Sequence, residues 1–287
     1  MKPKVYEFFD PNTFTYSYLV VDPKTQQCAV VDPVLDYDPA SGRTSYASAD
    51  KLITFINQRH LSVMWILETH VHADHLTAAP YIQQHVGGQL AIGQHITVVQ
   101  NTFGKLFNVG SDFSMDGSQF DHLFVDQETF MLGAISATAI HTPGHTPACM
   151  TYVIGDSAFV GDTLFMPDYG TARCDFPGGD AKMLYQSIQK LFTLPDETRV
   201  FMCHDYKAPG RETFSFQTTI AEERLHNIHV KHGMSEEAFV TMRQARDAML
   251  KMPTLLLPSV QVNMRAGIFP PAEDNGIQYL KIPVNQI

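Results

Sequence analysis

The segment Thr69-His70-Val71-His72-Ala73-Asp74-His75 constrains this chain more than any other stretch. Three imidazoles and one carboxylate directly follow the apolar run 64–67, which the pattern predicts to be a buried strand. On extended backbone a spacing of two places His70 and His72 on the same side, and Asp74 and His75 follow as the chain turns away. Two histidine ligands on a helix would instead stand four residues apart. The segment therefore predicts a metal site at the end of a strand.

The residue types in this segment limit which metal it can hold. Imidazole and carboxylate suit zinc, iron or manganese, and the segment offers no softer ligand. The alternative interpretation is a polar loop with surface histidines, since the chain has 13 histidines in all. Four possible ligands within seven residues favour the metal site over this alternative.

Three more ligand-type residues follow apolar, strand-like runs. His145 stands in a tight turn after 135–140, Asp162 follows 158–160, and His204 follows 200–202. Loops at one edge of a pair of sheets can bring such residues together over a rigid scaffold. These three residues are therefore candidates for the same site as the first segment.

The rest of the chain alternates strand and helix signals, which predicts two sheets with helices outside. We expect a hairpin over 16–31, further strands over 89–92, 124–140 and 150–160, and helices over 49–59, 76–86, 96–106 and 180–192. A last helix is expected to open at Ser235 and to stop at Pro253. Its apolar stripe, Phe239, Met242, Ala245, Met249 and Met252, is expected to pack in the core.

Composition excludes several classes of partner. A formal charge of −10 without any basic stripe argues against a nucleic-acid partner. No apolar run is long enough to cross a membrane, and no apolar stretch follows the first residues as in a secretion signal. The four cysteines form no CxxC pair, so we expect reduced thiols and a cytoplasmic location.

Four motifs, in this order, resemble the metallo-β-lactamase superfamily over nearly the whole chain: Thr-His-x-His-x-Asp-His, Thr-Pro-Gly-His-Thr, Gly-Asp-Thr-Leu-Phe and a late histidine. The resemblance implies the α/β fold of that superfamily, an αββα sandwich of two mixed β-sheets with outer helices. We expect one such domain over 1–287, with a C-terminal helical and tail extension from about residue 212.

Within the superfamily, several segments resemble the persulfide dioxygenase branch, and 117–122 resembles its proteobacterial type. These segments are 173–176, the glycines at 178–179 before 184–185, 191–195, 204–206 and 262–265. The resemblance implies one Fe(II) per chain, held by His70, His145 and Asp162, with open positions for substrate and dioxygen. In hydrolytic relatives the remaining ligand-type residues complete a site for two zinc or mixed metals. Both arrangements remain open for His72, Asp74, His75 and His204.

The implied reaction oxidises glutathione persulfide with O2 and water to sulfite and glutathione, in sulfide detoxification. The alternative is a glyoxalase II-like binuclear hydrolase of S-lactoylglutathione, and a non-catalytic scaffold is disfavoured because every ligand position is filled. Glutathione carries two carboxylates, so its pocket should contain cations or donors. Our candidates are Arg173, Tyr206, Lys207, Arg211 and Arg265. The resemblance also implies a homo-oligomer, expected to be a dimer.

Other polar residues have competing interpretations. Asp175 and Asp205 are equally consistent with orienting site groups and with capping backbone donors. Cys174 is expected to be a semi-buried replacement for threonine and not a catalytic thiol. The histidines with no spacing to the first segment are expected to be solvated: His60, His85, His95, His226, His229 and His232.

Overall fold

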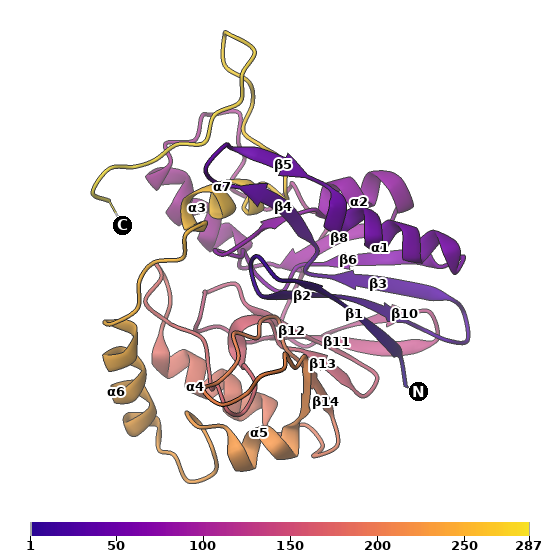
Figure 1. Cartoon of the computed structure of the whole chain (residues 1–287), viewed down its shortest axis with the longest axis vertical. Helices are drawn as coiled ribbons and strands as arrows, with labels where there is room; N and C mark the ends of the chain where they lie inside the picture. Colours follow the sequence, from indigo (N-terminus) through magenta and orange to yellow (C-terminus); the bar gives the residue numbers. More distant parts are fainter. Residues whose placement is uncertain (1, 287) are drawn as a thin grey trace.

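The computed structural model describes residues 2–286 and contains two six-stranded sheets that face each other (Figure 1). The first sheet has the order β1-β2-β3-β6-β8-β9, with β1 (Lys4–Asp10), β2 (Thr15–Val21), β3 (Gln27–Val31), β6 (Ser62–Leu67), β8 (Gln89–Gly93) and β9 (His122–Phe124). Its first three strands are antiparallel, whereas β3, β6, β8 and β9 are parallel. The carboxyl ends of these parallel strands therefore lie at one edge.

The second sheet and a small third one complete the β-structure. The second has the order β10 to β15, with β10 (Glu128–Leu132), β11 (Ile135–His141), β12 (Met150–Ile154), β13 (Ser157–Phe159), β14 (Arg199–Phe201) and β15 (Gln217–Thr219). Only the β13–β14 pair is parallel. The third sheet joins β5 (Arg43–Ser45), β4 (Val34–Asp38) and β7 (Leu76–Thr77).

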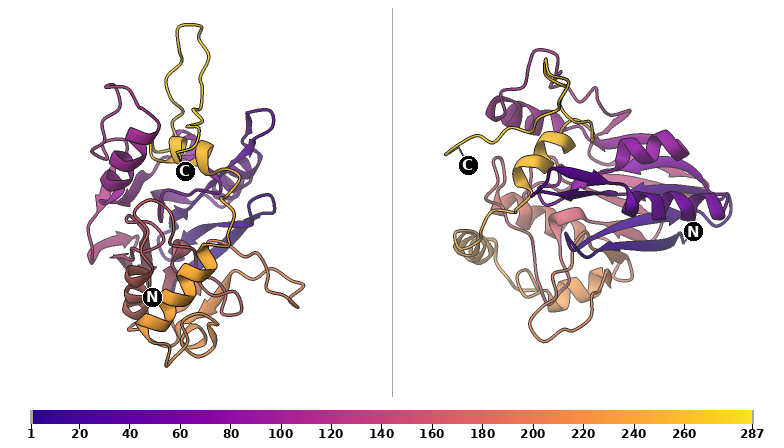
Figure 2. Two further views of the ribbon diagram at one scale, coloured as in Figure 1. Left: turned by 90° about the vertical axis from the view of Figure 1, so that its left-hand side faces the viewer. Right: turned by 45° about the horizontal axis from the view of Figure 1, so that its top comes forward.

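Helices cover the outer face of each sheet (Figures 1 and 2). The helices packed with the first sheet are α1 (Ala47–Gln58), α2 (Ala79–Val86), α3 (Ile96–Leu106) and α7 (Leu256–Asn263). Those packed with the second are α4 (Ala181–Leu191), α5 (Ile220–His226) and α6 (Glu236–Asp247). The predicted α/β fold class, an αββα sandwich with mixed sheets, is thereby confirmed.

Alternation along single strands explains why two sheets stack. In β2, Leu19 and Val21 pack under the helices of the first sheet, whereas Tyr18 and Val20 face the second sheet. In β14, Phe201 faces the first sheet and its neighbour Val200 faces the helices of its own side. Because successive side chains point to opposite faces of a strand, fully apolar strands must be covered on both faces.

Some predicted element boundaries were wrong. Leu76 and Thr77 do not begin a helix but pair with β4, and α2 begins at Ala79. The last predicted helix, α6, ends at Asp247, so Met249 lies beyond it and is 78% exposed. The predicted core stripe therefore holds for Phe239 and in part for Met242, but Ala245, Met249 and Met252 are exposed. Helix α7 was not predicted. Between residues 2 and 286 no helix is long and apolar enough to cross a membrane.

Candidate metal centre

The histidine-rich segment leaves the end of β6 as a loop that is fixed on both sides. Asp32 accepts hydrogen bonds from the Thr69 amide (2.7 Å) and the Thr69 hydroxyl (2.8 Å). From the other side, the Asn263 amide of α7 donates to the carbonyls of His72 (2.9 Å) and His75 (2.8 Å). The backbone that carries the four ligand-type side chains is therefore preorganised by buried polar contacts.

His70, His145 and Asp162 form one compact group. Their ligand atoms all lie within 4.8 Å of one another, and His145 Nε2 stands 3.5 Å from Asp162 Oδ2. The His145 Nδ1 donates to the Arg173 carbonyl at 2.7 Å, so its Nε2 keeps a lone pair directed at the group. Gly161 lets the backbone next to Asp162 lie close to Thr69. Its φ is +52°, and an added Cβ would stand 2.7 Å from Thr69 Oγ1.

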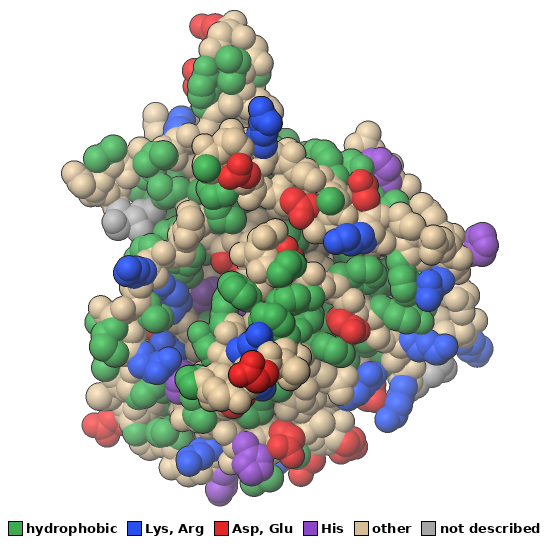
Figure 3. Space-filling view, viewed as in Figure 1, with side chains coloured by type: hydrophobic (Ala, Val, Ile, Leu, Met, Phe, Trp, Pro, Cys, Tyr) green, Lys and Arg blue, Asp and Glu red, His purple; other side chains and the backbone are tan. Residues whose placement is uncertain are grey.

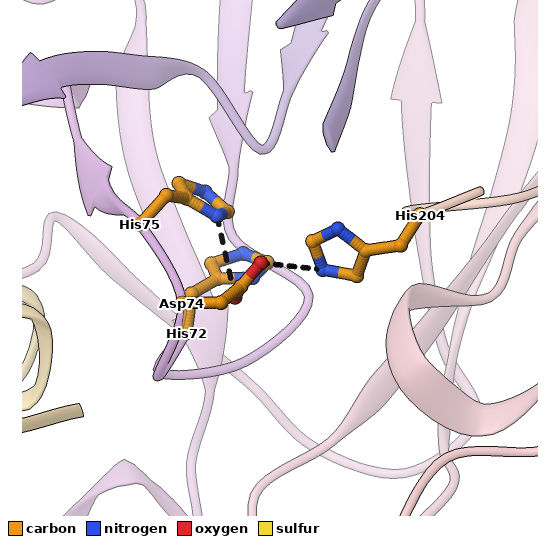
Figure 4. A group of neighbouring side chains, drawn as sticks. All are labelled: His72, Asp74, His75 and His204. Carbon is orange, nitrogen blue, oxygen red and sulfur yellow. Dashed lines mark ion pairs between the residues drawn. The ribbon is translucent and has the colours of Figure 1, made fainter. Parts of the chain in front are cut away.

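His72, Asp74, His75 and His204 form a second group, drawn in Figure 4. The Asp74 carboxylate stands between two rings, 3.5 Å from His75 Nδ1 and 3.2 Å from His204 Nε2. The same His204 nitrogen is 3.3 Å from Asp162 Oδ1, so the two groups adjoin through Asp162 and His204. The structure thus brings together all seven residues that the sequence proposed around the metal.

One ring nitrogen of His72 faces two carboxylates. Its Nε2 lies 3.0 Å from Asp32 Oδ1 and 3.6 Å from Glu68 Oε2, and both carboxylates are buried. Burial alone would lower the pKa of His72, but the Asp32 carboxylate raises it well above its usual value. While Nε2 faces these carboxylates, only Nδ1, which has no hydrogen-bond partner, is left to His72 for binding a metal. Neither Asp32 nor Glu68 was singled out from the sequence.

The polar atoms at this centre fit a metal ion. Seven buried atoms have no hydrogen-bond partner: His70 Nε2, His72 Nδ1 and Nε2, Asp74 Oδ2, His75 Nε2, Asp162 Oδ1 and His204 Nε2. So many buried polar groups without partners in one place would destabilise the fold unless a cation binds to them. Burial also lowers the pKa of His70 and His75, which favours the neutral imidazole that metals require.

A cavity of about 360 Å³ opens onto both groups, with Asp74, His145 and Asp162 in its wall. Figure 3 shows histidine side chains inside a hollow of the surface, with Lys and Arg side chains at its border. Aromatic side chains also line the cavity: Phe14, Phe165, Tyr169, Phe176 and Tyr206. A substrate in this cavity can therefore reach the metal ligands while its apolar part contacts aromatic rings.

Two of the five predicted substrate-binding residues line this cavity, Arg173 and Tyr206. The Arg173 guanidinium is already held by Asp175, through contacts of 2.6 and 2.7 Å, and by the Lys251 carbonyl. Arg173 therefore forms part of the cavity wall, and few of its N–H groups are free to bind a substrate.

The structure does not bring the other three to the cavity. Arg211 is paired with Asp168 and Asp205, and the Lys207 ammonium stands 4.2 Å from the centre of the Phe214 ring. Arg265 lines a different cavity. Asp205 thus binds Arg211 and nearby backbone amides, which favours its structural interpretation.

Two exposed cations at the cavity were missed from the sequence. Arg246, on α6, and Lys251, just beyond it, both line the cavity and form no ion pair with any residue between 2 and 286. Arg246 follows Arg243 by three residues, which places both on one face of a helix. That spacing is the sequence signal that points to Arg246.

The loop 171–174 contains the Arg173 carbonyl that accepts a hydrogen bond from His145, and the C-terminal helices fix this loop in place. The buried Arg243 donates to the Thr171 carbonyl (3.0 Å) and to Asp247, which also accepts from the Cys174 amide (2.9 Å). His229 accepts from the Thr171 amide at 2.9 Å, so the expectation that His229 is solvated was wrong. Burial lowers its pKa to about 4, which keeps Nδ1 free to accept this bond.

Asp247→Asn is expected to lower the free energy of unfolding by about 3 kcal/mol, because it leaves the buried Arg243 guanidinium without its counter-charge. It should also weaken metal binding roughly tenfold, since the loop that orients His145 loosens. Urea unfolding and metal titration measure the two effects. In the exposed pair Arg224–Asp196, Asp196→Asn should cost under about 1 kcal/mol. Equal stability of the two variants would contradict this role of Asp247.

Cys174 lies in the same loop and is buried. Burial raises the pKa of its thiol, so it stays protonated and unreactive near neutral pH. This agrees with the expected packing role and not with a catalytic thiolate.

Known proteins resemble this chain at several levels. The model of the metallo-beta-lactamase superfamily matches residues 10–204. A probable metallo-hydrolase of Burkholderia pseudomallei is 59% identical over 98% of both chains. A protein named glyoxylase B2 from Dictyostelium discoideum is 50% identical over 100% of this chain and 98% of its own length.

More distant relatives carry a different name. Human mitochondrial persulfide dioxygenase ETHE1 is 29% identical over 92% of this chain and 89% of its own length. Among solved structures, ETHE1 from Myxococcus xanthus superposes with a TM-score of 0.73 at 30% identity, over 92% of this chain and all of that one. The names of the similar proteins therefore divide between hydrolases and persulfide dioxygenases.

Proposed function

This chain belongs to the metallo-beta-lactamase superfamily and binds a metal cofactor, and we propose that it is an Fe(II)-dependent persulfide dioxygenase. The proposed reaction converts glutathione persulfide, O2 and water into sulfite, glutathione and two protons. The observation that carries this proposal is the compact group of His70, His145 and Asp162, whose ligand atoms all lie within 4.8 Å of one another. Two histidines and one carboxylate on one side of an ion are the ligand set of non-haem iron oxygenases. Similarity to the ETHE1 proteins supports the same reading.

In this proposal His70, His145 and Asp162 hold one iron per chain, which supplies the redox chemistry and binding positions that O2 and a persulfide sulfur need. The Arg173 carbonyl keeps the His145 ring in the correct tautomer and orientation. The aromatic wall of the cavity offers apolar contacts to the substrate beside the metal ligands. The terminal sulfur gains three oxygen atoms, two from O2 and one from water, and its bond to the glutathione sulfur breaks.

Arg246 and Lys251 are proposed to bind the glutathione carboxylates, because they are the exposed cations of the cavity. Arg246→Gln is expected to raise KM for glutathione persulfide roughly tenfold, with a much smaller change in kcat, since a charge-assisted hydrogen bond contributes about 1.5 kcal/mol. Steady-state kinetics at fixed O2 measure this. Arg43→Gln, on the exposed strand β5, is the matched control and should leave KM unchanged. The same KM in both variants would remove Arg246 from the binding site.

A second candidate function is a glyoxalase II-like hydrolase with two metals. The specific observation in its favour is the four-residue group His72, Asp74, His75 and His204 beside the first group. The names of the more similar relatives point the same way. In that case the two groups of residues would hold two metals, which would supply the activation of water needed to hydrolyse the thioester of S-lactoylglutathione.

Product analysis on one iron-loaded preparation separates the two functions. The dioxygenase proposal predicts sulfite from glutathione persulfide and no lactate from S-lactoylglutathione. Lactate formation without sulfite would transfer the assignment to the hydrolase.

The proposal includes a homodimer and a cytoplasmic location, the latter supported by four free, buried cysteines.

A further inference from the structure

Arg265 lines a second cavity of about 240 Å³, which shares no lining residue with the cavity at the metal centre. It lies between the loop after α3 and the C-terminal segment 270–281, part of the segment that projects from the molecule in Figures 1 and 2. Apolar side chains form much of its wall: Phe107, Val109, Met264, Pro270, Pro271 and Tyr279.

The Arg265 guanidinium lacks a counter-charge in hydrogen-bond contact. Its Nε is buried without a hydrogen-bond partner, and Arg265 forms no ion pair with any residue between 2 and 286. The side chain stands 4.2 Å from the centre of the Phe113 ring, which supports it from one side. Burial also lowers its pKa. A half-buried arginine in this condition has donors to offer to a ligand.

The cavity is anchored, so it does not need a ligand to form. The Gln261 side chain donates to the Lys281 carbonyl (2.9 Å) and accepts from the Lys281 amide (2.8 Å). The Lys281 ammonium donates to the Asn108 carbonyl at 2.7 Å, which ties the C-terminal segment to the loop after α3. Lys281 therefore brings a second cation to the rim of the same cavity.

We propose that this cavity binds a small monocarboxylate with a flat apolar body, whose carboxylate pairs with the Arg265 guanidinium. The planar fork of arginine matches a carboxylate, and the proline and aromatic wall matches a flat apolar group. Asp112 and Glu273 also line the cavity, and their repulsion grows with the negative charge of the ligand, so inorganic phosphate and dicarboxylates are disfavoured relative to a monocarboxylate that pairs with Arg265. Arg265 lies two residues after Asn263, which holds the metal-binding loop, and the site therefore adjoins the support of the metal centre.

Calorimetric titration of the metal-loaded full chain with benzoate tests this proposal. We expect saturable binding with a Kd near about 1 mM, at least about tenfold weaker binding of the uncharged benzamide, and a similar loss in Arg265→Gln. Arg246→Gln, which alters the other cavity, should bind benzoate like the unaltered protein. Lys281→Ala, at an exposed position, should weaken binding a few-fold and serves if Arg265→Gln does not fold.

Three results would overturn the proposal. Benzoate binding that persists unchanged in both Arg265→Gln and Lys281→Ala would place the carboxylate elsewhere, for example on the metal. Equal binding of benzamide would remove the charge requirement. No saturable binding up to about 10 mM would mean that the cavity does not take this class of ligand. None of these results depends on whether the metal centre is a dioxygenase or a hydrolase.

Discussion

His70→Ala is expected to abolish both persulfide oxidation and stable metal binding. His70 offers an orphaned Nε2 to the group that it forms with His145 and Asp162. Loss of even an outer-shell partner weakens a metal site about 10- to 100-fold, so loss of a ligand should exceed that. The fold should persist, because His70 lies in a loop beyond β6. Metal analysis, circular dichroism and oxygen uptake of the purified variant measure the three properties.

His75→Ala is the matched comparison, since it removes a second buried histidine from the same loop. If one iron is held by His70, His145 and Asp162, the His75 variant should retain about one iron per chain and lose much less activity. In a binuclear hydrolase the two variants would each lose a metal. Equal loss of metal and activity in both would therefore contradict the mononuclear account.

Replacing iron by zinc is expected to reduce oxygen uptake to the uncatalysed background. Zinc is redox-inert, and the same imidazole and carboxylate ligands accept it without a change of the protein. The zinc form should therefore fold, bind substrate and fail only in oxidation. Anaerobic removal of metal, reconstitution with either ion and measurement of oxygen uptake give the comparison.

Iron returned to the zinc-inhibited protein should restore uptake in proportion to the iron bound. Hydrolysis of S-lactoylglutathione by the zinc form, faster than by the iron form, would be the opposite outcome. It would indicate that the second group, with Asp74 and His204, takes part as ligands.

The fold was predictable because its signals are local. Continuous strand-like runs such as β2, which is buried on both faces, and the motif after β6 carry the pattern of two stacked sheets within short windows of sequence. The start of α2 was wrong because Leu76 and Thr77 pair with β4, a contact to a strand about 40 residues earlier that no local pattern contains. Helix α7 is short, and its buried residues include the polar Ser259, Gln261 and Asn263, so it gave no periodic apolar signal.

The sequence predicted which ligand-type residues lie together, but not their surroundings. Spacing and strand ends indicated the seven candidates, whereas the choice of His70, His145 and Asp162 as the iron ligands comes from the family resemblance and stays a prediction. Arginines have many uses, and Arg211 and Arg265 illustrate two of them, an ion pair with Asp205 and contact with Phe113. Which cation reaches a cavity depends on tertiary packing. Arg246 reaches the cavity because α6 packs beside the loop 171–174, to which Arg243 of the same helix is hydrogen-bonded.

The central claim is that one iron, held by His70, His145 and Asp162, oxidises a persulfide. Its most direct test is oxygen uptake by anaerobically purified protein given glutathione persulfide, with metal content measured on the same sample. The account predicts uptake that yields one sulfite per O2, with about one iron per chain. No uptake, together with two metals per chain and hydrolysis of S-lactoylglutathione, would contradict it and assign His75 and His204 to a second metal.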